Sequence, residues 1–126
     1  MLFGLLVPAT ARAQEPPTLR PGERIAFPGV TLTVLGLSVQ RNASSTLVAL
    51  NVRAQTDEVT FATLEAEHFR ILAAGVPRAP EWFAERIPRD AAKDHRVSFT
   101  LQDRTDDLVL RIRMNGVTEL RRLPAS

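Results

Sequence analysis

Apolar and polar residues alternate along much of this chain, and the clearest example is the segment Leu108–Arg122. Its centre is the pair Asn115-Gly116, and both residue types accept the positive φ angles of a tight hairpin turn. The strand before this turn has an apolar face that consists of Leu108, Leu110, Ile112 and Met114. Since its other face is polar, the segment predicts a β-hairpin in an antiparallel sheet with one buried side.

The register of this hairpin depends on which face receives Glu119 and Arg121. A two-residue loop places both on the apolar face, where burying an unpaired charge costs roughly several kcal/mol. A three-residue loop, with Gly116 in the left-handed conformation, instead places Glu119 opposite Arg111 on the polar face. Because a slip of one residue exchanges the two faces, we expect the three-residue, bulged register.

Similar alternation predicts further strands at 23–27, 30–40, 46–55, 59–64, 68–72 and 96–101. Within 30–40 the apolar positions change phase beside Gly36, which predicts either a β-bulge or a strand that crosses between sheets. The chain therefore has about seven short strands separated by turn residues. This spacing predicts an all-β fold, an immunoglobulin-like antiparallel β-sandwich.

The segment 73–94 is the least regular part of the sequence. Pro80 suits the first position of a helix and Pro88 its end, so we expect a short helix at 81–86. The apolar residues expected to cover an open end of the core here are Trp82, Phe83 and Ile87.

The N-terminal residues 1–13 have the pattern of a secretory signal peptide. The apolar run Leu2–Val7 is followed by the small-x-small site Ala11-Arg12-Ala13. No basic residue precedes the run, so we expect the true start to lie upstream. Three prolines make 14–22 an extended leader rather than packed structure, followed by one domain at 23–123. The protein is thus expected to be periplasmic or secreted, with no membrane-spanning segment.

Composition excludes several classes of function. The 126 residues contain no cysteine, which excludes disulfides, thiol catalysis and cysteine-ligated zinc within them. The formal charge is +2, from 16 basic and 14 acidic residues. The isoelectric point of about 10.3 reflects the scarcity of groups that titrate between histidine and arginine. We therefore expect no nucleic-acid partner, since phosphate binding requires a concentrated positive field.

Two clusters resemble metal sites, and for each the simpler interpretation is favoured. His68 lies close in sequence to Glu65 and Glu67, but neighbouring residues on a strand point to opposite faces, so they cannot all reach one ion. The acidic loop 103–107 lacks the spaced carboxylates of a calcium-binding loop. We expect solvated histidines, an ordinary polar loop, and no metal or other cofactor.

Ser98, His95 and Asp94 contain the side chains of a hydrolase triad. The chain has no Gly-x-Ser-x-Gly elbow, and alternation places Ser98 on the outer face of its strand. The protein is therefore expected not to be an enzyme.

The binding candidates are arginines and one aromatic pair. The arginines expected on outer sheet faces are Arg53, Arg111, Arg113, Arg121 and Arg122. Arginine suits bidentate recognition of carboxylate or phosphate, although a solvated charged face is the simpler interpretation. Trp82 and Phe83 are either a core lid or part of a binding surface, where tryptophan is enriched.

The order of several short segments resembles a bacterial family of small secreted or lipid-anchored immunoglobulin-like domains. This family is related to an immunoprotective extracellular antigen. The segments are Gly22-Glu23, Gly29–Leu35, Phe69–Leu72 followed by Gly75 and Pro77, Val97–Phe99, and Leu108–Ile112. The resemblance covers 22–123 and consists of strand pattern and turn glycines. The asparagine usual after the family's second strand is absent from Arg53-Ala54-Gln55. The resemblance implies a β-sandwich outside the cytoplasm and carries no catalytic motif.

Together these observations favour a non-enzymatic extracytoplasmic domain that binds a protein or a cell-envelope component. The alternative is a structural or accessory subunit whose edge strand pairs with a larger envelope protein. A hydrolase is the third and weakest hypothesis.

Overall fold

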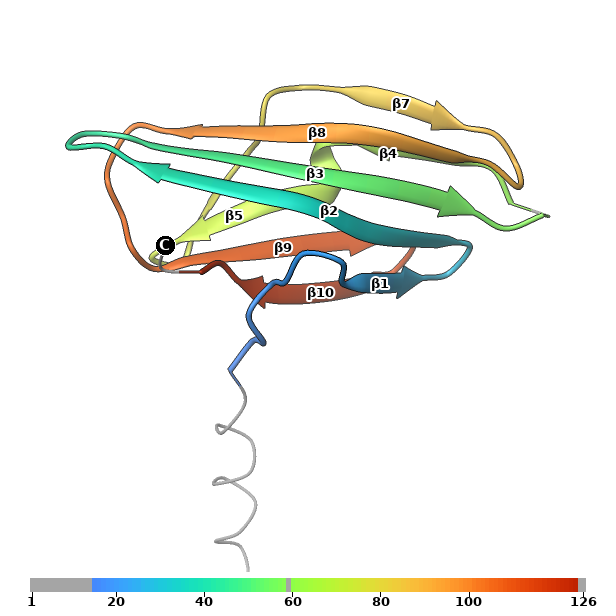
Figure 1. Ribbon diagram of the computed structural model, residues 1–126, viewed down its shortest axis with the longest axis horizontal. Helices are drawn as coiled ribbons and strands as arrows, with labels where there is room; N and C mark the ends of the chain where they lie inside the picture. The colour runs from blue at the N-terminus through green and yellow to red at the C-terminus, as the bar shows by residue number, and fades with distance from the viewer. Residues whose placement is uncertain (1–14, 59, 125–126) are drawn as a thin grey trace, which may run out of the picture.

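The computed structural model describes residues 15–58 and 60–124, so the predicted signal peptide at 1–13 lies outside the described residues. Two four-stranded antiparallel sheets pack face to face around one core (Figure 1). The predicted all-β, immunoglobulin-like antiparallel β-sandwich is confirmed.

The first sheet has the order β1-β2-β3-β8, with bounds Arg24–Phe27, Val30–Arg41, Thr46–Thr56 and Ala92–Leu101. The second has the order β10-β9-β5-β6, with bounds Val117–Arg122, Leu108–Met114, Phe69–Ala73 and Val76–Arg78. A separate two-stranded ribbon joins β4 (Ala62–Glu65) to β7 (Ala84–Ile87), and the 3₁₀ turn η2 (Ala66–His68) connects β4 to β5.

The core lies between the inward faces of the two sheets. It takes alternate residues from each long strand, as the sequence pattern predicts. From β3 and β9 these are Val48, Leu50, Val52, Ala54, Leu108, Leu110, Ile112 and Met114. The predicted phase change in β2 is a β-bulge, because its pairing with β3 shifts between Val34 and Gly36. The extra residue, Leu35, points outward and is 42% exposed.

The hairpin of β9 and β10 has a different register from the one expected. Met114 pairs with Val117 across a two-residue turn, and Glu119 lies opposite Ile112 rather than Arg111. Both turn residues have positive φ, 50° at Asn115 and 84° at Gly116, as in a type I′ turn. The bulged register is therefore wrong, and the reason is that the charges on the inward face of β10 find partners.

The helix expected at 81–86 is also wrong. Residues 84–87 form β7, which pairs antiparallel with β4. Phe83 and Ile87 are buried and Glu85 is partly buried, whereas Ala84 and Arg86 between them are exposed, which is the alternation of a strand. A six-residue helix would be marginal alone, whereas β4 supplies hydrogen-bond partners along the whole of β7.

The leader packs onto the sandwich, which corrects its expected lack of packing. Leu19 is 1% exposed and belongs to the core. Thr18 forms a parallel bridge with Arg122, and the backbone N–H of Leu19 donates to the carbonyl of Arg122 at 2.8 Å. The leader therefore covers the end of the β10 edge.

Candidate functional site

The outer face of the second sheet carries a group of arginines without carboxylates. The outward positions of β10, β9 and β5 are Thr118, Leu120, Arg122, Val109, Arg111, Arg113, Arg70 and Leu72. None of these strand residues is acidic. Within 15–58 and 60–124, no ion pair joins Arg70, Arg111 or Arg113 to a carboxylate. We call these three residues the arginine face.

Two residues of the arginine face lie directly opposite each other, since Arg70 of β5 pairs with Arg111 of β9. Like charges at such positions destabilise a sheet. The Arg70 Nη1 donates to the carbonyls of Ala66 and Phe69 at 3.1 and 2.7 Å, which fixes its guanidinium beside η2. The Arg113 Nε donates to the Thr118 hydroxyl at 3.2 Å. These neutral acceptors orient the guanidinium groups of Arg70 and Arg113, and no ion pair with a described carboxylate compensates their charge.

Arg53 does not belong to this group, because it lies on the outer face of the first sheet. It forms a two-point ion pair with Asp94 of β8, with N–O distances of 2.7 and 3.1 Å. The hydrogen bond from Arg53 lowers the pKa of Asp94. The structure thus separates two arginine sites that the sequence analysis grouped together.

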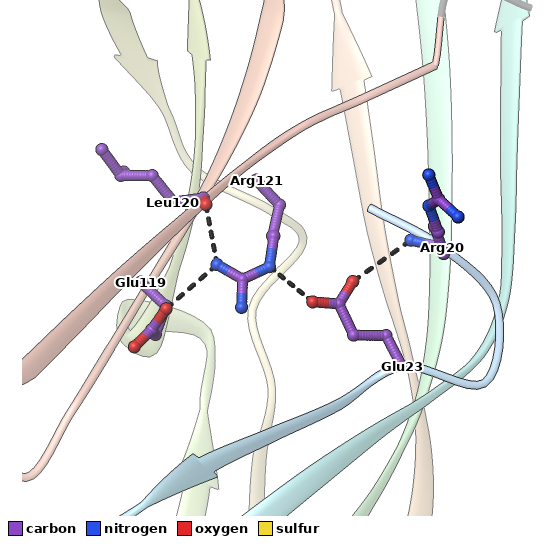
Figure 2. A network of polar contacts seen from close by, with 5 residues as sticks. All are labelled: Arg20, Glu23, Glu119, Leu120 and Arg121. Carbon is purple, nitrogen blue, oxygen red and sulfur yellow. Dashed lines mark hydrogen bonds and ion pairs between the residues drawn. The ribbon is translucent and has the colours of Figure 1, made fainter. Parts of the chain in front are cut away.

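Arg121 was expected on an outer face, and this is wrong. It lies on the inward parity of β10, and its Nε contacts Glu23 at 2.6 Å while its Nη1 contacts Glu119 at 3.0 Å (Figure 2). Its side chain is only 14% exposed. Arg122 points outward, as expected, and pairs with Glu15 of the leader at 2.7 Å. A carboxylate compensates the charge of each of these two guanidinium groups, so neither residue belongs to the arginine face.

The two aromatic candidates have opposite environments. Phe83 is 9% exposed, with its ring centroid 4.0 Å from that of His95 and 6.0 Å from that of Phe69. Trp82 is 83% exposed, so its predicted role in covering the core is wrong. Adjacent residues on an extended segment point to opposite sides, so the burial of Phe83 directs Trp82 toward solvent.

A groove of about 420 Å³ lies beside Trp82. It runs between η2 and the segment leading into β7, and its side walls include Arg70, Glu65, Glu67, Pro80 and Trp82. The Glu65 carboxylate accepts from the backbone N–H of His68. A hydrogen bond with Glu67 raises the pKa of Glu65. The groove therefore combines an aromatic surface with acceptors and one cation.

The histidines are held by the fold rather than solvated. His68 Nδ1 accepts a hydrogen bond from the backbone N–H of Glu65 at 3.1 Å, and burial lowers the pKa of His68. His95 packs on Phe83, and its Nδ1 lies 3.4 Å from Glu85. Within 15–58 and 60–124, no three acidic or histidine side chains gather in a metal-binding cluster.

The hypothetical triad is not assembled, because His95 has the inward parity of β8 whereas Asp94 and Ser98 have the outward one. The acidic loop is tied to basic residues from other strands. Asp103 contacts Arg78 at 3.5 Å, and Asp106 contacts Arg41 at 3.3 Å.

Sequence reasoning missed Arg70. Its strand was expected at 68–72, and alternation already placed Phe69 and Ile71 inward, so Arg70 had to point outward. The missing information was the neighbour of β5, because only the pairing with β9 brings Arg70 beside Arg111.

No protein-family model matches the chain, and no curated protein sequence matches it. Two solved structures share its fold. One is a candidate lipoprotein from Bacillus subtilis, with a TM-score of 0.62 and 7% identity, over 85% of this chain. The chain spans only 39% of that lipoprotein. The other is an uncharacterised β-sandwich protein from Clostridium difficile, with a TM-score of 0.61 and 7% identity, over 88% of this chain and 96% of that one. Identities this low establish the β-sandwich fold alone.

In the described part of the chain, no helix has the length and apolar character needed to cross a membrane.

Proposed function

We propose that this protein is a non-enzymatic extracytoplasmic domain that binds an acidic protein or cell-envelope component through the arginine face. The supporting observation is the uncompensated charge of Arg70, Arg111 and Arg113 on one sheet face. Arginine presents a planar fork of donors that matches a carboxylate or phosphate with two parallel hydrogen bonds.

The energetics of the arginine face favour a binding role over a purely structural one. Placing Arg70 opposite Arg111 costs stability, and no carboxylate on these strands offsets the cost. By contrast, Arg53, Arg121 and Arg122 each have a carboxylate partner within the chain. An acidic partner would supply the missing compensation for the arginine face.

Three observations support a location outside the cytoplasm. Residues 1–13 have the pattern of a signal peptide. The strand pattern resembles a bacterial family of small secreted or lipid-anchored domains. One protein of the same fold is a candidate lipoprotein.

An accessory subunit that pairs through an edge strand is the second candidate. The backbone N–H and carbonyl of Arg122 both form hydrogen bonds with the leader, so they point away from β9, toward the open edge of β10. Thr118 and Leu120 have the same parity as Arg122, so their backbone groups point toward this edge as well. Pro16 and Pro17 beside this edge have no N–H to donate. They cannot continue along β10 the pairing that the leader forms at Arg122, which leaves the edge at Thr118 and Leu120 available to a strand of a partner.

A pulldown from a cell-envelope fraction separates these functions. The baits are the wild type, the double variant Arg111→Ser/Arg113→Ser and, as a matched control on the other sheet, Arg53→Ser. We expect the wild type and the control to retain an acidic partner that the double variant loses. A partner retained equally by all three would favour edge pairing, and hydrolase turnover with no partner would favour an enzyme.

A further inference from the structure

The backbone on both sides of Trp82 is anchored to the sandwich, and Trp82 is the most exposed large hydrophobic residue among those described. The backbone N–H of Glu81 donates to the carbonyl of Ser98 at 2.8 Å, and the carbonyl of Phe83 accepts from Ala66 at 3.0 Å. These bonds anchor both neighbours of Trp82 to different parts of the sandwich. Phe83 adds a buried ring as a third anchor. The backbone that presents the indole therefore has little conformational freedom left to lose on binding.

The groove beside this indole offers mixed hydrogen-bonding chemistry. Glu65 and Glu67 supply carboxyl oxygens at one wall, and none of the ion pairs among the described residues involves either of them. Arg70 supplies a donor in the same groove, with its Nη1 already used by backbone carbonyls. The volume of about 420 Å³ lies within the range of small-ligand sites.

We propose that this groove binds a neutral sugar unit of a glycan chain, with the apolar face of the ring stacked on Trp82. Sugar hydroxyls donate to the carboxyl oxygens of Glu65 and Glu67 and accept from Arg70. The groove requires an apolar surface for the indole, donors for the two carboxyl groups and an acceptor for Arg70. A sugar ring offers all three, since it has one apolar face and a rim of hydroxyl groups that both donate and accept.

Charge argues against a cation as the occupant. The carboxylates and the indole would attract a cation, but Arg70 lines the same groove and repels it. The Glu65 carboxylate also accepts from the backbone N–H of His68, so part of its accepting capacity is already used within the chain. A neutral polyhydroxyl ligand binds through hydrogen bonds, so the opposite charges of Arg70 and the two glutamates do not oppose its binding.

The test uses the fluorescence of Trp82, which is the sole tryptophan of the chain. The probes are three neutral trisaccharides, built from β-1,4-glucose, β-1,4-N-acetylglucosamine and α-1,6-mannose, with tetramethylammonium chloride as the cation probe. We expect at least one trisaccharide, at millimolar concentration, to shift the emission to shorter wavelength and to protect Trp82 from acrylamide quenching. Failure of all three, or protection by tetramethylammonium alone, would overturn the proposal.

Calorimetric titration with the active trisaccharide then assigns the site. Trp82→Leu is expected to weaken binding by about tenfold or more, which is typical for the loss of a central aromatic contact. Glu67→Gln is expected to weaken it by about tenfold, because a charged acceptor for a sugar hydroxyl is lost. The double variant Arg111→Ser/Arg113→Ser is the control and should bind the sugar like the wild type. Sugar binding lost in this control but kept in Trp82→Leu would place the ligand on the arginine face and contradict the groove assignment. The proposed sugar site and the proposed acidic-partner site can thus be disproved independently of each other.

Discussion

Arg121 and Glu23 lie 98 residues apart in the sequence, and their side chains meet at an N–O distance of 2.6 Å (Figure 2). Arg121 belongs to β10 of the second sheet, and Glu23 directly precedes β1 of the first. Glu119 contacts the same guanidinium, and the backbone N–H of Arg20 donates to Glu23 at 3.2 Å. This network closes the side of the sandwich where the two sheets meet.

The first prediction concerns this closure. Arg121→Met should lower the free energy of unfolding by about 1–2 kcal/mol, because the variant leaves Glu23 and Glu119 partly buried without their cation. A double-mutant cycle with Glu23→Gln, measured by urea unfolding, should give a clear coupling between the two sites.

The matched control for this cycle is Arg53→Met with Asp94→Asn. That ion pair has similar geometry but lies in solvent, with side chains about half exposed. Its coupling should be smaller than that of Arg121 and Glu23. Equal couplings would show that the partial burial of Arg121 adds nothing.

The second prediction concerns the hairpin turn. Gly116 has a φ of 84°, and no atom beyond its chain neighbours lies within 4 Å of an added Cβ. Gly116→Ala should therefore cost about 1–2 kcal/mol from backbone strain alone. Gly36→Ala is the control, since Gly36 has no positive φ and its Cβ would meet only an ordinary contact. A similar loss in both variants, seen in urea unfolding, would contradict the type I′ turn.

The third prediction is a pH dependence of stability due to His68. Burial lowers the pKa of folded His68, so below its ordinary value of about 6.5 the unfolded chain binds the proton more readily. Stability should therefore fall as the pH drops below about 6.5 and be regained toward neutral pH. His68→Asn keeps an acceptor for the N–H of Glu65 but does not titrate. Its free energy of unfolding should change less between about pH 5 and pH 7; parallel curves would exclude His68 as the cause.

The fourth prediction compares the adjacent aromatic residues. Phe83→Ala should destabilise the fold by about 3–4 kcal/mol, because it leaves a cavity beside Phe69 and His95. Trp82→Ala should change stability by no more than about 0.5 kcal/mol, as for other exposed positions. Thermal unfolding of both variants checks this. A large loss in Trp82→Ala would mean that Trp82 packs on the core after all.

The sequence pattern was sufficient for features encoded by near neighbours. Alternation in β3, β5, β8 and β9 identified their inward residues, because a strand with one buried face must alternate. The phase change beside Gly36 likewise predicted the bulge in β2.

Features that depend on distant partners were not predictable in this way. The bulged register followed from assuming that Glu119 and Arg121 would be buried unpaired, whereas Glu23 supplies the missing charge. The helix at 81–86 was expected because local proline signals do not reveal that β4 pairs with this segment. The arginine face was not predictable for the same reason, since only the pairing of β5 with β9 brings Arg70 beside Arg111.

The most direct test of the proposed function is the affinity for immobilised poly-L-glutamate, an acidic probe, at low and at physiological salt. We predict that Arg111→Ser/Arg113→Ser binds at least about tenfold more weakly than the wild type and has a shallower salt dependence. Arg53→Ser should retain wild-type affinity, because Arg53 lies on the opposite sheet and is paired with Asp94. Equal affinities of the wild type and the double variant would contradict a binding role for the arginine face.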